Sequence, residues 1–567
     1  MSPKSIADGK IDLLLIGILF IIGIIAYAPY ITRGGFGPSD DMMLVSSSID
    51  HFSFSKFIAS RLTSSSSARP VSVLTLAAAL FLYRNNPTYY LVTQLIIWAG
   101  AIWALSFTIR HIFGKQEAWI FALIMVFPFF CSTILLSSYY VLSEYGLSIF
   151  FWALSLFFLT KHLISGKYRY YILSYASLLI GLLSLSIILP LLIITAIFPI
   201  VFQMDKKKIE DREGLIRSCL KYILPVLFAA LFFLIFQVFI TKYYQTAYNK
   251  IYGLAPISIK SFAQGAYYFV ALLCEVPLML FEAIPRLFTL QVLSVAIGIC
   301  IFILILRHDL KDDSTAGLQG MPKKRSFMLV IVISLIACAF SFFLSNYPAV
   351  TYGSYNRMML PSFILVCMIM SRVLSILVRK KNIIPVILLI LLWASSMIIQ
   401  LNNFVESWEL RKEVFCDCIG QLEKADLSRD PVLIANVPYF TQKNYNNEEV
   451  FWLTWAFEGG LKIFGFDRQI MAIPVCWRIV ADKDYNPAHN INNMYDAIEK
   501  DANIWYYEFD SKTHRSKLEK IATKDELRKK MEQVRSAKIN YSPLILRERM
   551  KNALRYFLVA THARSKS

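Results

Sequence analysis

Hydrophobic residues fill long unbroken stretches of roughly the first 400 positions and become scattered after that. A helix that crosses a lipid bilayer needs about 20 consecutive, mostly apolar residues. By this rule the pattern predicts about eleven transmembrane helices, so the expected fold class is an α-helical polytopic membrane protein. The predicted spans are residues 11–31, 90–109, 118–137, 145–161, 171–186, 188–203, 222–241, 287–306, 327–345, 361–378 and 383–401.

Two of these spans, 171–186 and 188–203, belong to one apolar run that is interrupted only near Pro190. If they formed a single span, the topology of everything after them would invert. If they form a hairpin, five basic loops lie on the same side as the N-terminus, which the preference of positive loops for the cytoplasm favours. Those loops are residues 110–115, 161–170, 205–221, 307–326 and 379–381. The outer side then receives residues 32–89, 138–144, 242–286 and 346–360, and everything after Asn402.

Two further apolar stretches are too short or too broken to cross comfortably. Residues 71–83 are predicted to form a helix in the outer interface of the membrane, and residues 266–282 a similar partial helix, interrupted by Pro277. The first apolar run is long enough to span, so we expect it to be retained as a signal-anchor helix.

After residue 402 charges become frequent, which predicts two domains. Residues 1–402 would form a membrane module with its first outer loop at 32–89, and residues 403–567 a small α/β domain on the periplasmic side. The expected helices are residues 405–424, 448–463 and 512–534, and the expected strands residues 432–437, 469–475 and 503–509. Four tryptophans either build the core of this domain or stack on sugars: Trp452, Trp455, Trp477 and Trp505.

Composition supports the membrane class and excludes others. The 567 residues are 56% hydrophobic and 17% charged, which is too apolar for a soluble protein of this size. The net charge is +19, but many lysines and arginines lie in short loops between apolar spans. There they orient the chain and meet anionic lipid headgroups, so we expect membrane lipid and not nucleic acid as a partner.

The candidate chemistry begins with Asp40 and Asp41, just beyond the first span in a loop that starts with GGFGP at residue 34. Neighbouring residues of an extended backbone point opposite ways, so one acid can face a reacting group while structure holds the other. A carboxylate near lipid suits a general base, and the pair could also bind Mg²⁺ or Mn²⁺. The alternative is a solvated or helix-capping acid pair.

Three more charged residues are placed at the outer surface. Arg69, which precedes Pro70, and Arg357, which precedes the span 361–378, suit a phosphate group because guanidinium offers a planar fork and a fixed charge. Each could instead anchor the chain at the headgroups. Glu144 opens a span after the second outer loop, where it is either a second catalytic acid or a helix-capping residue.

The order of these features resembles the GT-C superfamily of polyprenyl-phosphate-sugar-dependent glycosyltransferases. A first helix leads to the acidic pair, then to Arg69 and a short interfacial helix, and a later span carries Pro128 and Phe129. Within the superfamily the chain is most similar to the serotype-converting O-antigen glucosyltransferases. The resemblance covers about residues 10–400.

The resemblance implies a bacterial inner-membrane enzyme whose active site faces the periplasm. It would transfer a sugar from a polyprenyl-phosphate donor to a cell-envelope glycan or lipid acceptor, with O-antigen or lipopolysaccharide as the expected target. Asp40, Asp41 and Glu144 would be catalytic, and Arg69 and Arg357 would bind the donor phosphate. The reaction would invert the anomeric carbon, with an aspartate as base and with a divalent cation on Asp40 and Asp41 if the enzyme is metal-dependent.

Two other membrane functions fit parts of the pattern. A transporter or flippase for lipid-linked sugars would carry charges buried within its spans and related halves. An O-antigen polymerase or ligase would also have many spans and outer loops, but with a large loop late in the chain.

Overall fold

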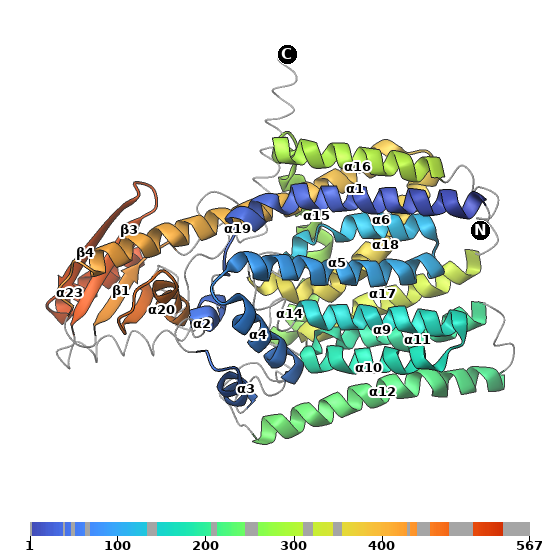
Figure 1. The fold of residues 1–567 in the computed structure, drawn as a ribbon, viewed down its shortest axis with the longest axis horizontal. Helices are drawn as coiled ribbons and strands as arrows, with labels where there is room; N and C mark the ends of the chain where they lie inside the picture. The colour runs from blue at the N-terminus through green and yellow to red at the C-terminus, as the bar shows by residue number, and fades with distance from the viewer. Residues whose placement is uncertain are drawn as a thin grey trace, which may run out of the picture.

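The structure is a computed structural model in which helices form a long bundle and a small sheet lies beyond one end of it (Figure 1). Helix α19 (Ile383–Leu422) runs unbroken from the bundle into the sheet region. The predicted domain boundary, between residues 402 and 403, falls within this helix. The structure describes residues 3–37, 40–46, 52–62, 69–132, 145–205, 212–243, 259–309, 321–343, 354–427, 431–438, 454–475 and 503–536.

Helices that coincide with the predicted spans run along the bundle (Figure 1). They are α1 (Pro3–Arg33), α5 (Pro87–Ile112), α6 (Lys115–Met125), α9 (Tyr145–Ser165), α10 (Tyr168–Ser184), α11 (Leu192–Asp205), α12 (Arg212–Tyr243), α16 (Leu290–Asp309), α17 (Met321–Phe343), α18 (Leu360–Arg379) and α19. Within the described residues, nine segments are long and apolar enough to cross a membrane. The helical, multi-pass membrane class is therefore confirmed.

The uncertain pair of spans forms a hairpin. The Gln203 amide, near the end of α11, donates to the Tyr222 hydroxyl at 2.9 Å. The Tyr175 hydroxyl, near the start of α10, donates to the Tyr222 carbonyl at 3.2 Å, and Tyr171 donates to the Lys221 carbonyl at 2.7 Å. Because the end of α11 and the start of α10 meet the same part of α12, α10 and α11 run antiparallel. The connection is the 3-10 turn η3 (Ser186–Leu191) around Pro190.

The described parts of the predicted basic loops lie at one end of the bundle together with the start of α1. Asp12 forms ion pairs with Arg110 at 3.1 Å and Lys115 at 3.2 Å. Arg379 donates to the Gln116 side chain at 2.8 Å, which brings the α18–α19 connection to the same place. We call this the basic end, and the opposite end the domain end.

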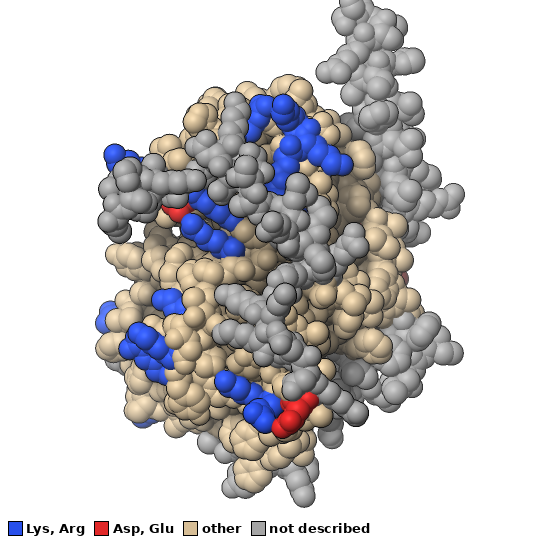
Figure 2. Space-filling model, turned by 90° about the vertical axis from the view of Figure 1, so that its right-hand side faces the viewer, with Lys and Arg blue, Asp and Glu red and all other residues tan. Residues whose placement is uncertain are grey.

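Two further contacts extend the basic end. The Lys161 ammonium lies 5.9 Å from the centre of the Phe107 ring, so the α9–α10 connection joins it. Helix α16 runs antiparallel to α1, because Gln291 donates to the Ala26 carbonyl at 3.0 Å and Arg307 follows at the other end of α16. Figure 2 views the molecule from this end and shows lysine and arginine side chains spread over it. The common placement agrees with the hairpin topology, and the cytoplasmic location of this end stays a prediction.

One apolar segment lies across the bundle instead of along it. It consists of α14 (Ile259–Val270), a π-helical turn η4 (Ala271–Glu275) and α15 (Val276–Glu282), and Figure 1 shows α14 and α15 one above the other. Tyr268 donates to the Leu335 carbonyl on α17, and Ser396 on α19 donates to the Met279 carbonyl, both at 3.1 Å. The π-turn stands directly before Pro277, which lacks an N–H donor. The predicted interruption is thus a local widening of a continuous helix.

The C-terminal region contains a four-stranded sheet of order β2–β1–β3–β4. Strands β1 (Val432–Asn436), β2 (Met471–Val475) and β3 (Ile504–Asp510) are parallel, and β4 (Arg515–Ile521) is antiparallel to β3. Side chains alternate between the two faces, with Ile434 packing toward α23 (Lys524–Ser536) and Leu433 toward α19 and α20 (Thr454–Ile463). Both faces are covered by helices, as the α/β prediction requires. The expected helix 512–534 is wrong in its first half, because residues 515–521 form β4 and the helix begins only at Lys524.

Helix α6 ends within the bundle, so the predicted span 118–137 is wrong over residues 126–132, and residues 133–137 lie outside the described residues. Pro128 follows and cannot donate to the helix, and a short 3-10 turn, η2 (Phe129–Cys131), comes next. Three aromatic donors from three other helices reach the carbonyls at this end of α6. Tyr27 donates to Val126, Trp98 to Met125, and Trp393 to both Ile124 and Phe127, whose carbonyls also accept from the amides of Phe127 and Phe129. An apolar environment without water favours such donors.

We expect Trp393→Phe to destabilise the bundle by about 1–3 kcal/mol, because two buried carbonyls lose the indole donor, although each keeps a backbone amide, and the smaller ring leaves space unfilled. Thermal unfolding in detergent would measure the change. The control is Trp103→Phe, at a ring that is largely exposed on α5. Equal unfolding temperatures for the two variants would contradict the role given to Trp393.

Candidate functional site

The chain leaves α1 at the domain end through a tightly packed glycine turn. The Gly34 amide donates to the Tyr30 carbonyl at 2.8 Å, which completes the last turn of the helix. Gly35 lies against the indole ring of Trp408 on α19, where a Cβ atom would come within 1.9 Å of a ring carbon. Only glycine fits there, so the turn is held directly against the part of α19 that leaves the bundle.

Asp41 is buried at the start of the short helix α2 (Asp40–Ser46), with 1% of its surface exposed. Its Oδ2 atom accepts a hydrogen bond from the Gly37 amide at 2.7 Å. Its carboxylate also interacts electrostatically with Tyr30 on α1 and Tyr90 on α5. Asp40 belongs to the same helix, but its side chain lies outside the described residues.

Arg411 is a fully buried arginine on α19 that sequence reasoning did not identify. Its Nη1 donates to the Phe36 carbonyl at 2.8 Å, and its Nε donates to the Ser407 carbonyl at 3.3 Å. The guanidinium lies over the rings of Phe404 and Trp408, 5.8 Å and 5.3 Å from their centres. The cationic group is thereby held between aromatic faces and backbone oxygens at the glycine turn.

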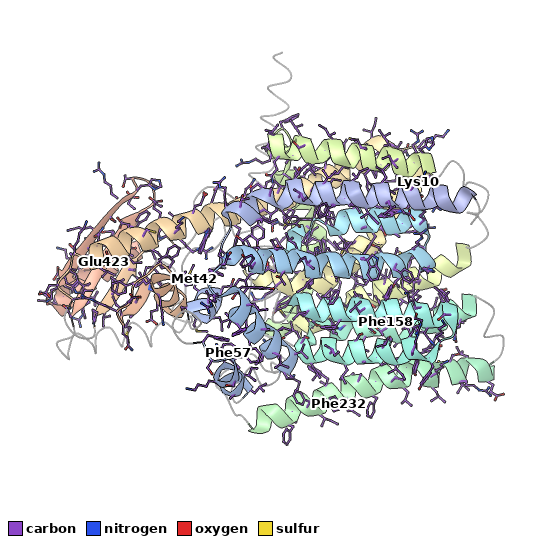
Figure 3. All side chains as sticks on the ribbon, in the orientation of Figure 1. Lys10, Met42, Phe57, Phe158, Phe232 and Glu423 are labelled. Carbon is purple, nitrogen blue, oxygen red and sulfur yellow. The ribbon has the colours of Figure 1, made fainter. Side chains whose placement is uncertain are left out.

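Helix α20 of the C-terminal region packs directly on α2. A Cβ atom at Gly459 would lie 2.6 Å from the Met42 carbonyl oxygen, so the two backbones are in contact. Gly460 faces the Phe415 ring on α19 in the same way. Figure 3 shows Met42 between the bundle and the sheet. Burial raises the pKa of Glu458 on α20, while the hydrogen bond from the Ala472 amide partly offsets this.

Arg69 stands at the start of α4 (Pro70–Tyr83), half-buried at the domain end. Its carbonyl accepts from the Val73 amide at 3.1 Å, and Pro70 occupies the first helical position, which tolerates a missing N–H. One turn on, Ser72 donates to the Ser184 carbonyl at the end of α10, at 2.9 Å. The predicted interfacial helix therefore exists, and its first turn is fixed against the α10–α11 connection.

Arg357 is 7% exposed and lies in the 3-10 turn η6 (Ser354–Met359). Its Nε donates to the Tyr145 hydroxyl at 3.2 Å, and its guanidinium lies 5.6 Å from the centre of that ring. Tyr145 in turn donates to the sulfur of Met358. An arginine that is buried on the protein side in this way is not a headgroup anchor snorkelling into water.

A chain of contacts places Asp41, Arg69 and Arg357 at the same end of the bundle. Tyr145 begins α9, and one turn later Ser148 donates to the Leu185 carbonyl at 3.0 Å, beside the residue that Ser72 contacts. Arg357 and Arg69 thus lie on either side of the α9–α10 pair. The second half of α4 shares a hydrophobic cluster with Met42 of α2, which links Arg69 to the acidic helix.

Other predicted residues cannot be placed. Glu144 lies outside the described residues, as do Trp452, Trp477 and the side chain of Trp455. Trp505 on β3 packs beside the hydrophobic cluster that includes Phe36 and Phe415. No group of three His, Cys, Asp or Glu side chains suited to one metal ion occurs within the described ranges.

The fold and the site together define a multi-pass helical membrane protein with charged groups gathered at one end and a sheet domain beyond it. No protein-family model and no curated protein matches the sequence.

Among solved structures, the chain is similar to ArnT from Cupriavidus metallidurans in its apo state, with 11% identity, 89% of this chain and 93% of that chain covered, and a TM-score of 0.39. For ArnT bound to undecaprenyl phosphate the identity is 11%, the coverage is 88% of this chain and 92% of that chain, and the TM-score is 0.37. The third similar structure is the archaeal oligosaccharyltransferase AglB from Archaeoglobus fulgidus, in complex with an inhibitory peptide and a dolichol-phosphate. Here the identity is 12%, the coverage is 88% of this chain and 69% of that chain, and the TM-score is 0.39. Likeness at this level does not establish a family or an activity.

We expect Gly459→Ala to loosen the contact between α20 and α2 at a cost of about 1–3 kcal/mol, because the added methyl group overlaps backbone. Thermal unfolding in detergent and protease resistance of residues 40–46 would measure it. The matched control is Gly420→Ala on α19, where a Cβ atom would meet nothing within 4 Å and alanine favours the helix. A Gly459→Ala protein as stable as the Gly420→Ala protein would refute the contact.

Proposed function

We propose that the protein is an integral membrane glycosyltransferase of the GT-C type. It would transfer a sugar from a polyprenyl-phosphate donor to a cell-envelope glycan or lipid, with O-antigen or lipopolysaccharide as the acceptor. The observation that carries the proposal is the joint placement of a buried carboxylate, Asp41, and a buried arginine, Arg357, at one end of an apolar helix bundle. A lipid-linked sugar phosphate needs both groups beside a membrane.

The reaction would proceed as one displacement. The acceptor oxygen bonds to the anomeric carbon as the bond from that carbon to the phosphate oxygen breaks, and the electron pair leaves with the phosphate. Asp41 takes the proton of the acceptor hydroxyl. Arg357 and Arg69 stabilise the charge that grows on the phosphate. Because the acceptor attacks opposite the departing phosphate, the anomeric configuration inverts.

The environment of Asp41 suits a base. Burial favours the protonated form of a carboxylate, and a hydrogen bond from a backbone amide favours the ionised form. Asp41 is buried and accepts such a hydrogen bond from the Gly37 amide. Asp40 is the neighbouring acid and Glu144 a further one, and a divalent cation would bind at Asp40 and Asp41 if one takes part. The domain end would face the periplasm of a bacterial inner membrane.

Transport of lipid-linked sugars is the second candidate. The buried Glu275 accepts a hydrogen bond from Tyr267 in the segment that lies across the bundle, and the buried Glu117 pairs with Arg372 and Arg379. Charges within a bundle are what a transporter requires. Arg372 therefore forms an ion pair inside the bundle. Covalent attachment of the sugar to an acceptor separates the two functions, because a transporter leaves the donor intact.

We expect Asp41→Asn to lower sugar transfer by about 10²–10⁴-fold, since the variant keeps the shape but cannot accept a proton. The assay uses membranes, a panel of polyprenyl-phosphate-linked glucose, galactose and mannose, and lipopolysaccharide as acceptor. Asp40→Asn is measured separately and should lose less of the sugar-transfer activity than Asp41→Asn. The exposed Glu409→Gln is the control. Wild-type transfer in both asparagine variants would eliminate the assigned base.

Arg357→Ala should raise the KM for the donor by about tenfold or more and lower kcat, because a buried guanidinium loses its contact with the phosphate. Arg357→Lys keeps the positive charge but loses the planar pair of donors, so its kinetic constants should lie between those of the wild type and Arg357→Ala. Steady-state kinetics with varied donor would measure both constants. Arg286→Ala, at an exposed arginine, is the matched control. Unchanged constants in a folded Arg357→Ala protein would assign the phosphate elsewhere.

A further inference from the structure

One peptide unit connects Arg411 with Asp41. The Phe36 carbonyl accepts from Arg411, and the amide of the same peptide unit, at Gly37, donates to Asp41. We infer that Arg411 is a positioning residue that acts on the catalytic carboxylate through the Phe36–Gly37 peptide. This inference rests on the proposed function, and it adds to it a residue from the C-terminal half of the chain.

The physical basis is polarisation of an amide. A positive charge that donates to the carbonyl oxygen draws electron density toward it and makes the N–H of the same unit a stronger donor. The hydrogen bond to Asp41 is then strengthened, which favours the ionised carboxylate and fixes its orientation. Both donor–acceptor distances are short, 2.8 Å at the carbonyl and 2.7 Å at the amide.

The position of Arg411 is set by packing on either side of it along α19. Trp408 is held against Gly35, where no side chain fits, and Phe415 is held against Gly460 of α20. The guanidinium is fully buried and lies over the Phe404 and Trp408 rings. Since α20 also rests on α2 through Gly459, the same C-terminal elements hold both ends of the connection.

Two titratable groups of neighbouring helices interact with Asp41. They are the hydroxyls of Tyr30 and Tyr90, and both are neutral at ordinary pH. Arg33 at the end of α1 pairs with Glu409 at 2.7 Å, and their side chains are 59% and 45% exposed. This pair also links α19 to the chain near the end of α1, but in solvent. It therefore offers a matched control.

The test compares Arg411→Met, Arg411→Lys and Arg33→Met by sugar transfer with the donor panel and lipopolysaccharide. Arg411→Met should lower kcat by about tenfold or more and leave the donor KM within about twofold, because one hydrogen bond to the carboxylate is weakened. The acidic limb of its pH profile should move to higher pH by about one unit, since the ionised form loses support. Arg411→Lys can still donate to the carbonyl, so its kcat and its pH profile should be close to those of the wild type. Arg33→Met should match the wild type in both.

A folded Arg411→Met protein with the wild-type pH profile and kcat would overturn the inference. If Arg411→Met does not fold, Arg411→Lys and Arg411→Gln are compared instead. Both can donate to the carbonyl, but only lysine is charged. Equal pH profiles for these two variants would overturn the inference. A wild-type protein that transfers no sugar, or an Asp41→Asn protein that transfers normally, would instead defeat the proposed function. The two failures are therefore distinguishable.

Discussion

Backbone polar groups that become unpaired inside an apolar bundle must find donors from other helices, and this constraint shapes the domain end. A lost hydrogen bond at such a place is not replaced by water. The structure supplies such donors in three ways. Aromatic N–H and O–H groups cap α6, serine hydroxyls take the carbonyls at the end of α10, and Arg411 takes the carbonyl at the glycine turn. The bonds from Trp393, Ser72 and Arg411 join segments that are distant in sequence.

These connections explain why the domain end can hold charged side chains in fixed positions. At the basic end, lysines and arginines lie mostly at the surface, and the buried Glu117 is paired with Arg372 and Arg379. At the other end, Asp41, Arg357 and Arg411 are buried. A surface charge is screened by water and ions and contributes little to precise geometry. A buried charge must be paired or hydrogen-bonded, so its surroundings determine where it lies. Only the second arrangement suits chemistry.

Much of the bundle could be predicted because span length and loop charge are properties of the local sequence. The hairpin around Pro190 and the shared end of the basic loops follow from them. The end of α6 did not follow from hydropathy, since residues 118–137 are mostly apolar. Pro128 marks the break in the sequence, and Trp98 and Trp393 from two other helices supply donors there. Arg411 was missed for a similar reason. It follows the last apolar run among Glu406, Glu409 and Lys412, so it looks like one more solvent-exposed charge of a surface helix.

Because α19 is unbroken, it fixes the position of the C-terminal sheet region relative to the helix bundle. A flexible linker at residues 402 and 403 would let the sheet region move independently, and nothing in it could then hold a group at the glycine turn. A continuous helix instead carries Arg411 to a fixed distance from the bundle, and the tight contacts at Gly35 and Gly459 leave little freedom on either side. The C-terminal region is therefore part of the framework around Asp41, and it need not bind an acceptor itself to influence the chemistry there.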